Sequence, residues 1–438
     1  MRRKRSPPRQ KPEGVSIQQR RLPFILGAMA AIGPFSIDMY LPALPMLGEA
    51  LGSTAGAAQA SLAVFFLGMA LGQIFYGPLA DRYGRRLPLF IGLSVYTLAS
   101  LACALAPNIE SLIAARLLQA LGGCTGMVIS RAVVRDVTDE RGAIRLMAKL
   151  MLVMGVAPII APIIGGALLG VIGWRGIFLC LAAYGAVLLL VIALFLPETL
   201  APERRRRDGL RQVFGVWQRL LGDGYFMGHA LAGGLVIGGM FAYITASPFV
   251  FMQLHGVRPE DYGFYFGANA LGIMLAGQIT ARLSDRLAPA RMLSIAIGIS
   301  AISGALLLLV TSTGLGGFTA IVVSLFLYVS TIGAVMPLTA ARTMAPHGAI
   351  AGNASALMGT LQFGSGALVG VALGALQNGT ALPMALVVLC RSSATRHRAS
   401  ASGPWRATSS RARCRSGPAN EGSASRAGAK QRLRSRSR

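Results

Sequence analysis

The stretch Gly77-Pro78-Leu79-Ala80-Asp81-Arg82-Tyr83-Gly84-Arg85-Arg86 places three arginines and one aspartate between two apolar segments. Neither neighbouring segment, residues 56–76 or residues 87–106, contains a charged side chain. Each has about 20 residues, the length that a helix needs to cross a hydrocarbon core about 30 Å thick. The sequence therefore predicts two membrane-spanning helices joined by a tight loop. Because Lys and Arg are retained on the cytoplasmic side, the arginines place this loop there.

The composition also indicates a membrane protein. Of the 438 residues, 54% are hydrophobic and 13% are charged, whereas a soluble globular protein carries about 25% charged residues. The formal net charge of +26 is spread over loops and both tails, so it does not indicate a nucleic-acid partner. Most cysteines lie in apolar runs, and their spacing predicts neither a disulfide framework nor a metal site.

Apolar segments recur along the whole chain and predict an all-α polytopic membrane protein. Eleven of them are long enough to span a bilayer, and a twelfth candidate, residues 381–390, is too short. The eleven predicted spans are residues 22–47, 56–76, 87–106, 109–130, 150–172, 176–196, 225–252, 262–281, 292–311, 317–337 and 352–377.

Arginine is concentrated in alternate loops of this arrangement. The other loops carry almost none, apart from Arg175 and Arg258. Since positive residues mark the cytoplasmic side, the N-terminus is predicted to be cytoplasmic.

The longest internal loop divides the chain into two bundles. This loop, residues 197–224, is predicted to be a cytoplasmic linker between an N-terminal bundle (22–196) and a C-terminal bundle (225–390). Residues 1–21 are polar and basic, and they are predicted to form a disordered cytoplasmic tail.

A short internal repeat supports the division into halves. Asp81-Arg82 follows the second span, and Asp285-Arg286 follows the eighth, which is the second span of its own half. Parallel repeated halves with a substrate site between them are an architecture of transporters. Chance is the open alternative, because Asp-Arg is a common dipeptide.

The chain changes character after Cys390. Residues 391–438 are rich in Arg, Ser, Ala and Gly, so they are predicted to be disordered and to leave the twelfth helix truncated. A shifted reading frame would produce such a tail. A basic arm for anionic lipid or nucleic acid is the alternative interpretation.

Three motifs resemble those of a known family. Residues 77–86 resemble the signature loop between the second and third helices of the major facilitator superfamily. Residues 116–123, RLLQALGG, are similar to its fourth-helix pattern of Arg, Gln and Gly. Residues 158–166, PIIAPIIGG, are similar to the fifth-helix pattern of its drug–proton antiporters, although Ala157 and Ala161 stand where glycine is usual.

Two further stretches are similar to one group within that family. They are residues 37–45, IDMYLPALP, and residues 173–178, GWRGIF. Both resemble the bicyclomycin and chloramphenicol resistance group, Bcr/CflA. The whole resemblance covers about residues 22–389.

The resemblance implies a fold of two six-helix halves and a function in export. The expected activity is proton-driven export of drugs or small amphipathic compounds across a bacterial inner membrane, by a monomer that needs no cofactor beyond the proton gradient. Three alternatives stay open: a metabolite exporter, an uptake symporter, and a product impaired in transport by its unusual C-terminus. An enzyme is not indicated, because the sequence has no metal spacing, nucleophile elbow or phosphate loop.

Asp38 is the acidic residue placed most clearly within a span. A carboxylate there costs on the order of 3 kcal/mol on insertion scales, so it is expected to face a cavity or a partner. Burial favours the protonated form of a carboxyl group, which suits a proton carrier. Arg116 is expected at the same depth, roughly 10–12 Å from the outer face, and is predicted to be its counterpart. The alternatives are a structural pair for Asp38 and a helix–helix clasp between Arg116 and Gln119.

The loop of residues 77–86 is interpreted as a conformational latch, with a mere topology signal as the alternative. A carboxylate there can pair with arginines or with a helix N-terminus, and its glycines allow close helix approach and a tight turn. The predicted latch residues are Gly77, Asp81, Arg82, Gly84, Arg85 and Arg86.

Pro158 and Pro162 lie four residues apart in one span and are predicted to kink it. Gly165 and Gly166 are expected to let another helix come close. Ordinary kinked packing is the alternative to a role in antiport. Polar side chains that could line a cavity are Tyr40, Gln119, Asn269, Gln278 and Gln362.

Overall fold

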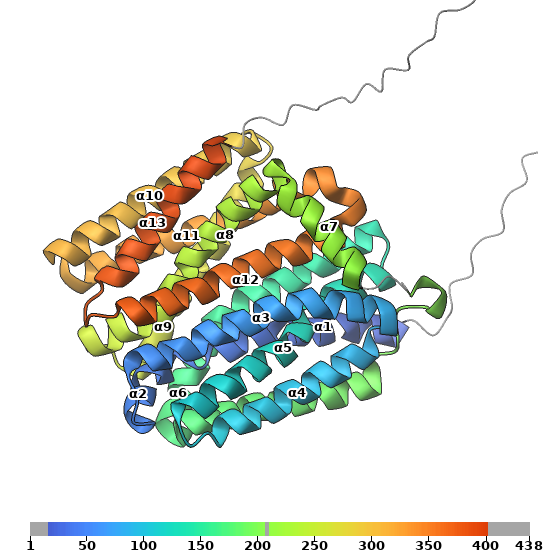
Figure 1. Cartoon of the computed structure of the whole chain (residues 1–438), viewed down its shortest axis with the longest axis horizontal. Coiled ribbons are helices and arrows are strands. Elements are labelled where there is room, and N and C mark those ends of the chain that lie inside the picture. Colours follow the sequence, from blue (N-terminus) through green and yellow to red (C-terminus); the bar gives the residue numbers. More distant parts are fainter. Residues whose placement is uncertain (1–15, 206–209, 402–438) are drawn as a thin grey trace, which may run out of the picture. The chain divides into compact units, whose positions relative to one another are not determined.

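Long helices run back and forth along one direction of the molecule (Figure 1). The computed structural model describes residues 16–205 and 210–401, and this part contains helices and turns but no strand. The helices are α1 (Ser16–Asp38), α2 (Leu44–Ala50), α3 (Ala55–Tyr83), α4 (Arg86–Ala104), α5 (Ile109–Val137), α6 (Glu140–Phe195), α7 (Leu210–Gly222), α8 (Gly224–Pro248), α9 (Pro259–Leu283), α10 (Pro289–Thr313), α11 (Gly317–Met344), α12 (Ala351–Leu376) and α13 (Leu382–Ala401).

Helix α6 is two membrane spans in one continuous element. Its 56 residues would extend about 80 Å as a straight helix, far more than the hydrocarbon core requires. Gly173 interrupts it with φ +66° and ψ −178°, outside the helical region. Arg175 donates to the Ala106 carbonyl beside α4 and α5, and Ala193 accepts from Arg86 at the other end of the bundle. The chain therefore reverses direction at Gly173.

Nine helices in the described part of the chain are long and apolar enough to span a membrane, with α6 counted once. Helix α9 is not among them, but its 25 residues pack between α6 and α11. Helix α13 has only a short apolar portion, Leu382–Ala394. The prediction of an all-α membrane protein is thus confirmed in its architecture.

Packing joins the helices within each half of the sequence and across the halves. Helices α1, α3, α4, α5 and α6 pack on one another, and so do α8 to α13. Two long contacts connect these groups, α3 against α12 and α6 against α9.

Three predicted boundaries differ from the structure. Helix α1 begins at Ser16, inside the predicted tail, whose first 15 residues lie outside the described part. The predicted linker contains helix α7, because Trp217 and Leu220 bury an apolar stripe against Phe226 and Leu357. Helix α13 continues through residues 391–401, in the segment that the sequence predicts to be a disordered tail. Residues 402–438 lie outside the described part of the chain.

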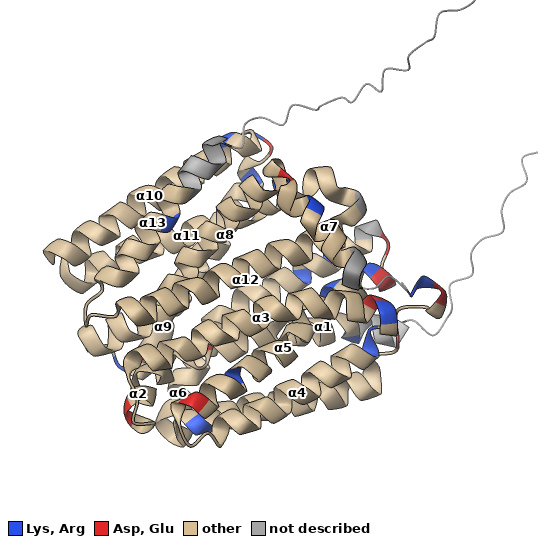
Figure 2. Ribbon diagram, viewed as in Figure 1, with Lys and Arg blue, Asp and Glu red and all other residues tan. Residues whose placement is uncertain are grey.

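Charged residues are unevenly placed along the bundle. We call its two ends the α2 end and the α7 end, after the helices that lie there (Figure 1). Lys and Arg gather mainly at the α7 end, and the middle of the bundle is almost free of charge (Figure 2). Two charged residues on the membrane-spanning helices, Asp38 and Arg116, are buried.

Candidate functional site

Asp38 is the last residue of α1 and lies near the α2 end, where the two groups of helices meet. Its side chain is buried, and its carboxylate makes no hydrogen bond or ion pair with any residue that the structure describes. It interacts electrostatically with Tyr243 of α8 and Tyr262 of α9. Asp38 therefore faces the C-terminal helices, as a buried acid without a cationic partner in the described chain.

Arg116 does not pair with Asp38, which corrects the prediction. Its Nη1 donates to the Ser36 carbonyl at 3.0 Å and to Gln119 Oε1 at 2.7 Å. Gln119 in turn donates to Ser100 of α4 at 2.8 Å. Through these bonds the guanidinium holds α1, α4 and α5 together. Although Arg116 and Asp38 were expected at the same depth, the Arg116 side chain points into the N-terminal helices and not toward Asp38.

Aromatic rings enclose this buried cation. The centre of the guanidinium lies 4.7 Å from the Tyr40 ring, 4.2 Å from the Phe65 ring and 5.7 Å from the Phe178 ring. Such ring faces attract a desolvated cation. The Nε and Nη2 atoms of Arg116 have no hydrogen-bond partner among the described residues.

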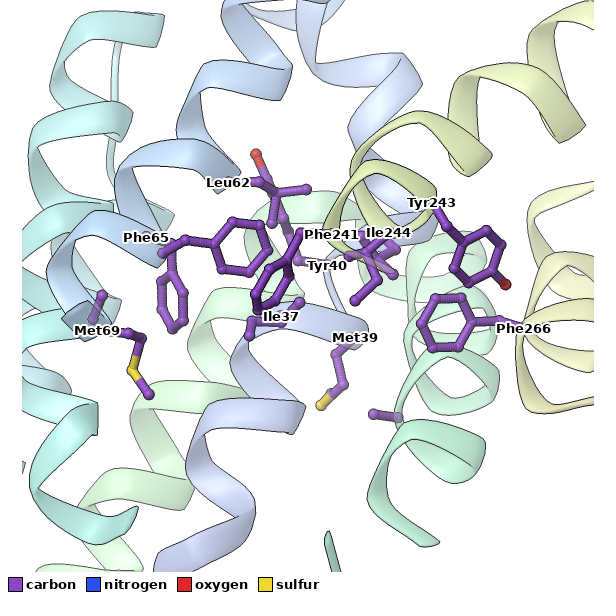
Figure 3. Close-up of a cluster of buried hydrophobic side chains, with 14 of the residues drawn as sticks. Ile37, Met39, Tyr40, Leu62, Phe65, Met69, Phe241, Tyr243, Ile244 and Phe266 are labelled. Atoms are coloured by element: carbon purple, nitrogen blue, oxygen red, sulfur yellow. The ribbon is translucent and has the colours of Figure 1, made fainter. Parts of the chain in front are cut away.

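On the other side of Asp38, the C-terminal helices supply a cluster of hydroxyl and amide groups. Asn269 Nδ2 donates to the Tyr243 hydroxyl at 2.8 Å, and the Tyr262 hydroxyl bonds Ser247 at 2.9 Å. The Tyr243 ring stacks on Phe266, with centroids 5.4 Å apart. Figure 3 shows this pair beside Met39 and the end of α1.

The two glycines of the predicted antiporter motif contact different parts of the molecule. A Cβ atom on Gly165 would overlap the carbonyl oxygen of Met39, the residue after Asp38. A Cβ atom on Gly166 would lie 2.5 Å from the Pro259 carbonyl oxygen at the start of α9. The adjacent Pro158 and Pro162 lie within α6, where the only non-helical residue is Gly173, and the kink stays a prediction.

The halves are closed at the α2 end. Helices α3 and α12 meet there through backbone, with a Cβ on Gly56 placed 2.9 Å from the Gly374 carbonyl oxygen. Toward the α7 end, a Cβ on Gly352 of α12 would lie 3.5 Å from Nη1 of Arg135, at the end of a long side chain. Backbone thus meets backbone between the halves at the α2 end, whereas toward the α7 end the halves meet through side chains, among them Arg135 near Gly352 and Ile74 of α3 near Leu357 of α12.

The predicted latch is organised by Arg85. Its guanidinium bonds Asp81 at 2.6 Å and Asp136, at the end of α5, at 2.7 Å. Burial opposes the charge of Arg85, but these hydrogen bonds and the charges of Asp136 and Asp81 outweigh it and raise the pKa of the guanidinium. The loop is therefore tied to α5 within the N-terminal group of helices.

Glu198, just after α6, is a second anchor that the sequence did not reveal. Its carboxylate accepts from the backbone amides of Arg85 at 2.8 Å and Arg86 at 3.1 Å. Burial disfavours its charge, yet the amides of Arg85, Leu200 and Arg86 and the charge of Arg205 prevail and lower the pKa of Glu198. The loop and the segment after α6 are thereby held together.

The other predicted latch residues behave differently. Gly84 has φ +92° and ψ 174°, so the tight turn requires glycine. The expected close approach at Gly77 is wrong in this conformation, because a Cβ there would meet nothing within 4 Å. Arg82 lies over the Tyr83 ring, 5.3 Å from its centroid, rather than in the ion-pair network of the described residues.

Replacing Gly84 by alanine is expected to destabilise the protein by ~1–3 kcal/mol, because its backbone conformation is confined to glycine. The new Cβ would also lie 2.5 Å from Glu198 Oε2. The thermal midpoint of the solubilised protein measures this loss, with Gly77→Ala as the matched control. Equal midpoints for the two variants would contradict the expectation.

The five predicted cavity residues are not brought together. Tyr40 and Gln119 are fully buried within the N-terminal helices, where Tyr40 bonds Ser61 at 2.9 Å, so neither is exposed to a cavity here. Asn269 lies in the tyrosine cluster near Asp38, Gln362 approaches Met336 Sδ at 3.9 Å, and Gln278 is exposed on α9. A hollow of about 590 Å³ at the α2 end is lined by other residues, among them His255, Tyr265 and Phe318.

Comparisons with known proteins agree with this architecture. The profile of the Major Facilitator Superfamily matches residues 26–371. The MFS-type transporter YdgK of Bacillus subtilis (strain 168) is 40% identical over 369 residues, covering 84% of this chain and 91% of that protein. A bicyclomycin resistance protein homolog of Haemophilus influenzae is 29% identical, covering 82% and 90%, and multidrug resistance protein D of Escherichia coli (strain K12) is 29% identical, covering 84% and 93%.

Solved structures show the same fold at low sequence identity. A bacterial homolog of the human lysosomal transporter Spinster, in an inward-facing and occupied conformation, aligns with TM-score 0.67 and 18% identity, covering 89% of this chain and 98% of that one. A D-xylose-proton symporter aligns with TM-score 0.67 and 15% identity, covering 87% and 98%. With helices packed as described and a family profile matching most of its length, this chain is a multi-pass membrane transporter that belongs to the Major Facilitator Superfamily.

Proposed function

We propose that this transporter exports drugs or small amphipathic compounds in exchange for protons that flow inward. The relatives named for bicyclomycin and multidrug resistance support export of this class of compound. The observation that carries proton coupling is Asp38, a buried carboxyl group at the junction of the halves with no cationic partner in the described chain. Such a group can gain and lose a proton without breaking an ion pair.

The distribution of charge supports the orientation. Because Lys and Arg are retained on the cytoplasmic side, we place the α7 end in the cytoplasm of a bacterial cell and the α2 end outside the inner membrane (Figure 2). Backbone contact at the α2 end then makes this conformation closed to the outside. A protomer with both halves in one chain needs no second copy for this cycle, so we propose a monomer driven by the proton gradient alone.

The cycle follows from the two positions of the halves. With the α2 end open, Asp38 takes a proton from outside as the exported compound leaves. With the α2 end closed, as here, Asp38 releases the proton to the cytoplasmic side and a new compound binds. A proton that binds Asp38 with different affinity in the two states shifts the equilibrium between them.

Everted membrane vesicles with a preformed pH gradient test this proposal. Adding bicyclomycin is expected to dissipate part of the gradient, reported by a pH-sensitive dye, in vesicles that contain the protein and not in vesicles without it. A panel of other amphipathic drugs should give graded responses. If every compound against which the transporter protects cells left the pH gradient unchanged, proton exchange would be rejected.

A further inference from the structure

Two buried glutamines lie where the halves meet, and the amide of each has only a weak partner. Gln73 of α3 belongs to the N-terminal half, and its Nε2 lies 4.0 Å from Met127 Sδ of α5. Gln362 of α12 belongs to the C-terminal half, and its Nε2 lies 3.9 Å from Met336 Sδ of α11. A thioether sulfur is a weak acceptor, and neither amide oxygen has a hydrogen bond among the described residues. Because a poorly bonded buried amide is costly, both groups require an explanation.

The packing of α3 on α12 brings the two amides to the same stretch of the junction. A Cβ on Gly359 of α12 would lie 2.9 Å from the carbon of the Gln73 amide and 3.0 Å from its nitrogen and its oxygen. The Gln73 amide therefore lies flat against the α12 backbone. Gln362 follows Gly359 by three residues, which is the spacing of neighbours on a helix surface. Thr360 donates to the Ala70 carbonyl of α3 at 3.4 Å in the same contact.

Aromatic rings border this stretch on the side of the α2 end. Phe66 precedes Gln73 by about two turns of α3, and its ring centroid lies 4.2 Å from that of Phe241 of α8, across the junction. The Phe241 centroid also lies 5.7 Å from that of Phe363, the residue after Gln362. An apolar wall thus adjoins two polar groups, which is the composition of sites that bind small molecules.

The helices around the amides carry almost no charge. Asp, Glu, Lys and Arg are all missing from four stretches of sequence, residues 56–80 of α3, 224–248 of α8, 317–341 of α11 and 351–376 of α12. On α5, Arg131 follows Met127 by about one turn and is positive. Asp38, the buried acid, lies near the α2 end. A cation moved beside the amides would lose its water without gaining an opposite charge, which is costly.

We propose that Gln73 and Gln362 are the polar part of the binding site for the exported compound, and that this compound is uncharged and joins an apolar body to hydrogen-bonding groups such as amides or hydroxyls. The inference deepens the proposed function and rests on it. Parting of α3 from α12 toward the α7 end exposes both amides to the cytoplasmic side, from which the compound enters. Because each half supplies one amide, a compound that bonds to both also favours closure of the halves around it.

Equilibrium binding to the full-length protein in lipid nanodiscs, without a pH gradient, tests the class of compound. The uncharged probes are bicyclomycin and chloramphenicol, which carry amide and hydroxyl groups. The charged probes are tetraphenylphosphonium and tetraphenylborate, which match each other in shape and have opposite charges. At least one uncharged probe should bind about tenfold more tightly than either ion. This comparison uses the unaltered protein, so it does not depend on the folding of any variant.

Gln73→Met and Gln362→Met test the two residues, because methionine keeps the length of the side chain and removes its amide. Each variant should bind the uncharged probe about three- to tenfold more weakly, the loss expected for one hydrogen bond. Gln278→Met makes the same change at an exposed position of α9 and is the matched control. It should bind like the unaltered protein, and the thermal midpoints of all variants verify folding.

The outcomes separate the inference from the proposed function. Unchanged affinities in folded Gln73→Met and Gln362→Met, or tighter binding of either ion than of both uncharged probes, overturn the inference and leave export standing. Equal weakening in Gln278→Met would show a general effect of the substitution and would also overturn the inference. If the unaltered protein bound none of the four probes, export of such drugs would be rejected and the inference with it.

Discussion

Asp38→Asn is expected to abolish concentrative export while leaving the protein folded and able to bind its compounds. The side chains have nearly the same shape, and the carboxylate makes no hydrogen bond or ion pair in the described chain that the amide would break. The amide cannot take up and release a proton, so the proton gradient can no longer drive export. Everted vesicles should therefore show drug uptake no greater than protein-free vesicles, whereas exchange of labelled for unlabelled drug without a gradient should persist.

Glu49→Gln is the matched control for this expectation. Glu49 is an exposed acid on α2, eleven positions after Asp38, and neutralising it removes the same charge from the same end of the molecule. Its uptake should equal that of the unaltered protein. Gradient-driven uptake that survives in Asp38→Asn would remove this carboxyl group from the coupling mechanism.

The sequence was sufficient for the course of the chain across the membrane. Length, absence of charge and the loop from Gly77 to Arg86 located the spans, because hydrocarbon tolerates few alternatives to a long apolar helix. It also identified Asp38 and Arg116 as unusual, since a charge within a span is rare. Chain order and depth could be inferred from these patterns alone.

Rotation about the helix axes could not be inferred. Asp38 and Arg116 were predicted at equal depth, yet one faces α8 and α9 and the other faces Ser36 and Gln119. The same limit explains the missed anchors of the loop. Asp136 and Glu198 follow Arg85 by 51 and 113 residues, and only the packing of α5 and α6 brings them to it.

One helix and the extension of another, both absent from the sequence-based prediction, did leave signals in the sequence. In α7, Val213, Val216, Trp217 and Leu220 recur at the spacing of one helix face. The end of α13, residues 391–401, is rich in Ala and Arg, which favour helix. The average composition of both segments is that of a charged loop and a polar tail, and it conceals these helical signals.

Gly166→Val is expected to hold the transporter open at the α2 end. The Cβ would lie 2.5 Å from the Pro259 carbonyl oxygen of the opposite half, where backbone cannot give way as a side chain can. Overpacking of this kind costs about 1–3 kcal/mol. The cost falls on the closed state alone, so the equilibrium between the states should shift roughly tenfold to a hundredfold toward the open one.

Spin labels on Glu49→Cys and His255→Cys, in a chain whose native cysteines are replaced by serine, measure the separation of the halves at this end. In Gly166→Val, the distance distribution between the two labels should move to longer values. Export should fall as the fraction of open molecules rises. Gly170→Val is the control on the same helix, because its Cβ would approach only the Glu260 side chain, at 3.8 Å. Gly165→Val differs in kind, since its Cβ would overlap Met39 within the same half. It should lower the thermal midpoint without favouring the open state. If Gly165→Val and Gly166→Val gave the same distances, closure of the α2 end through the contact of α6 with α9 would be refuted.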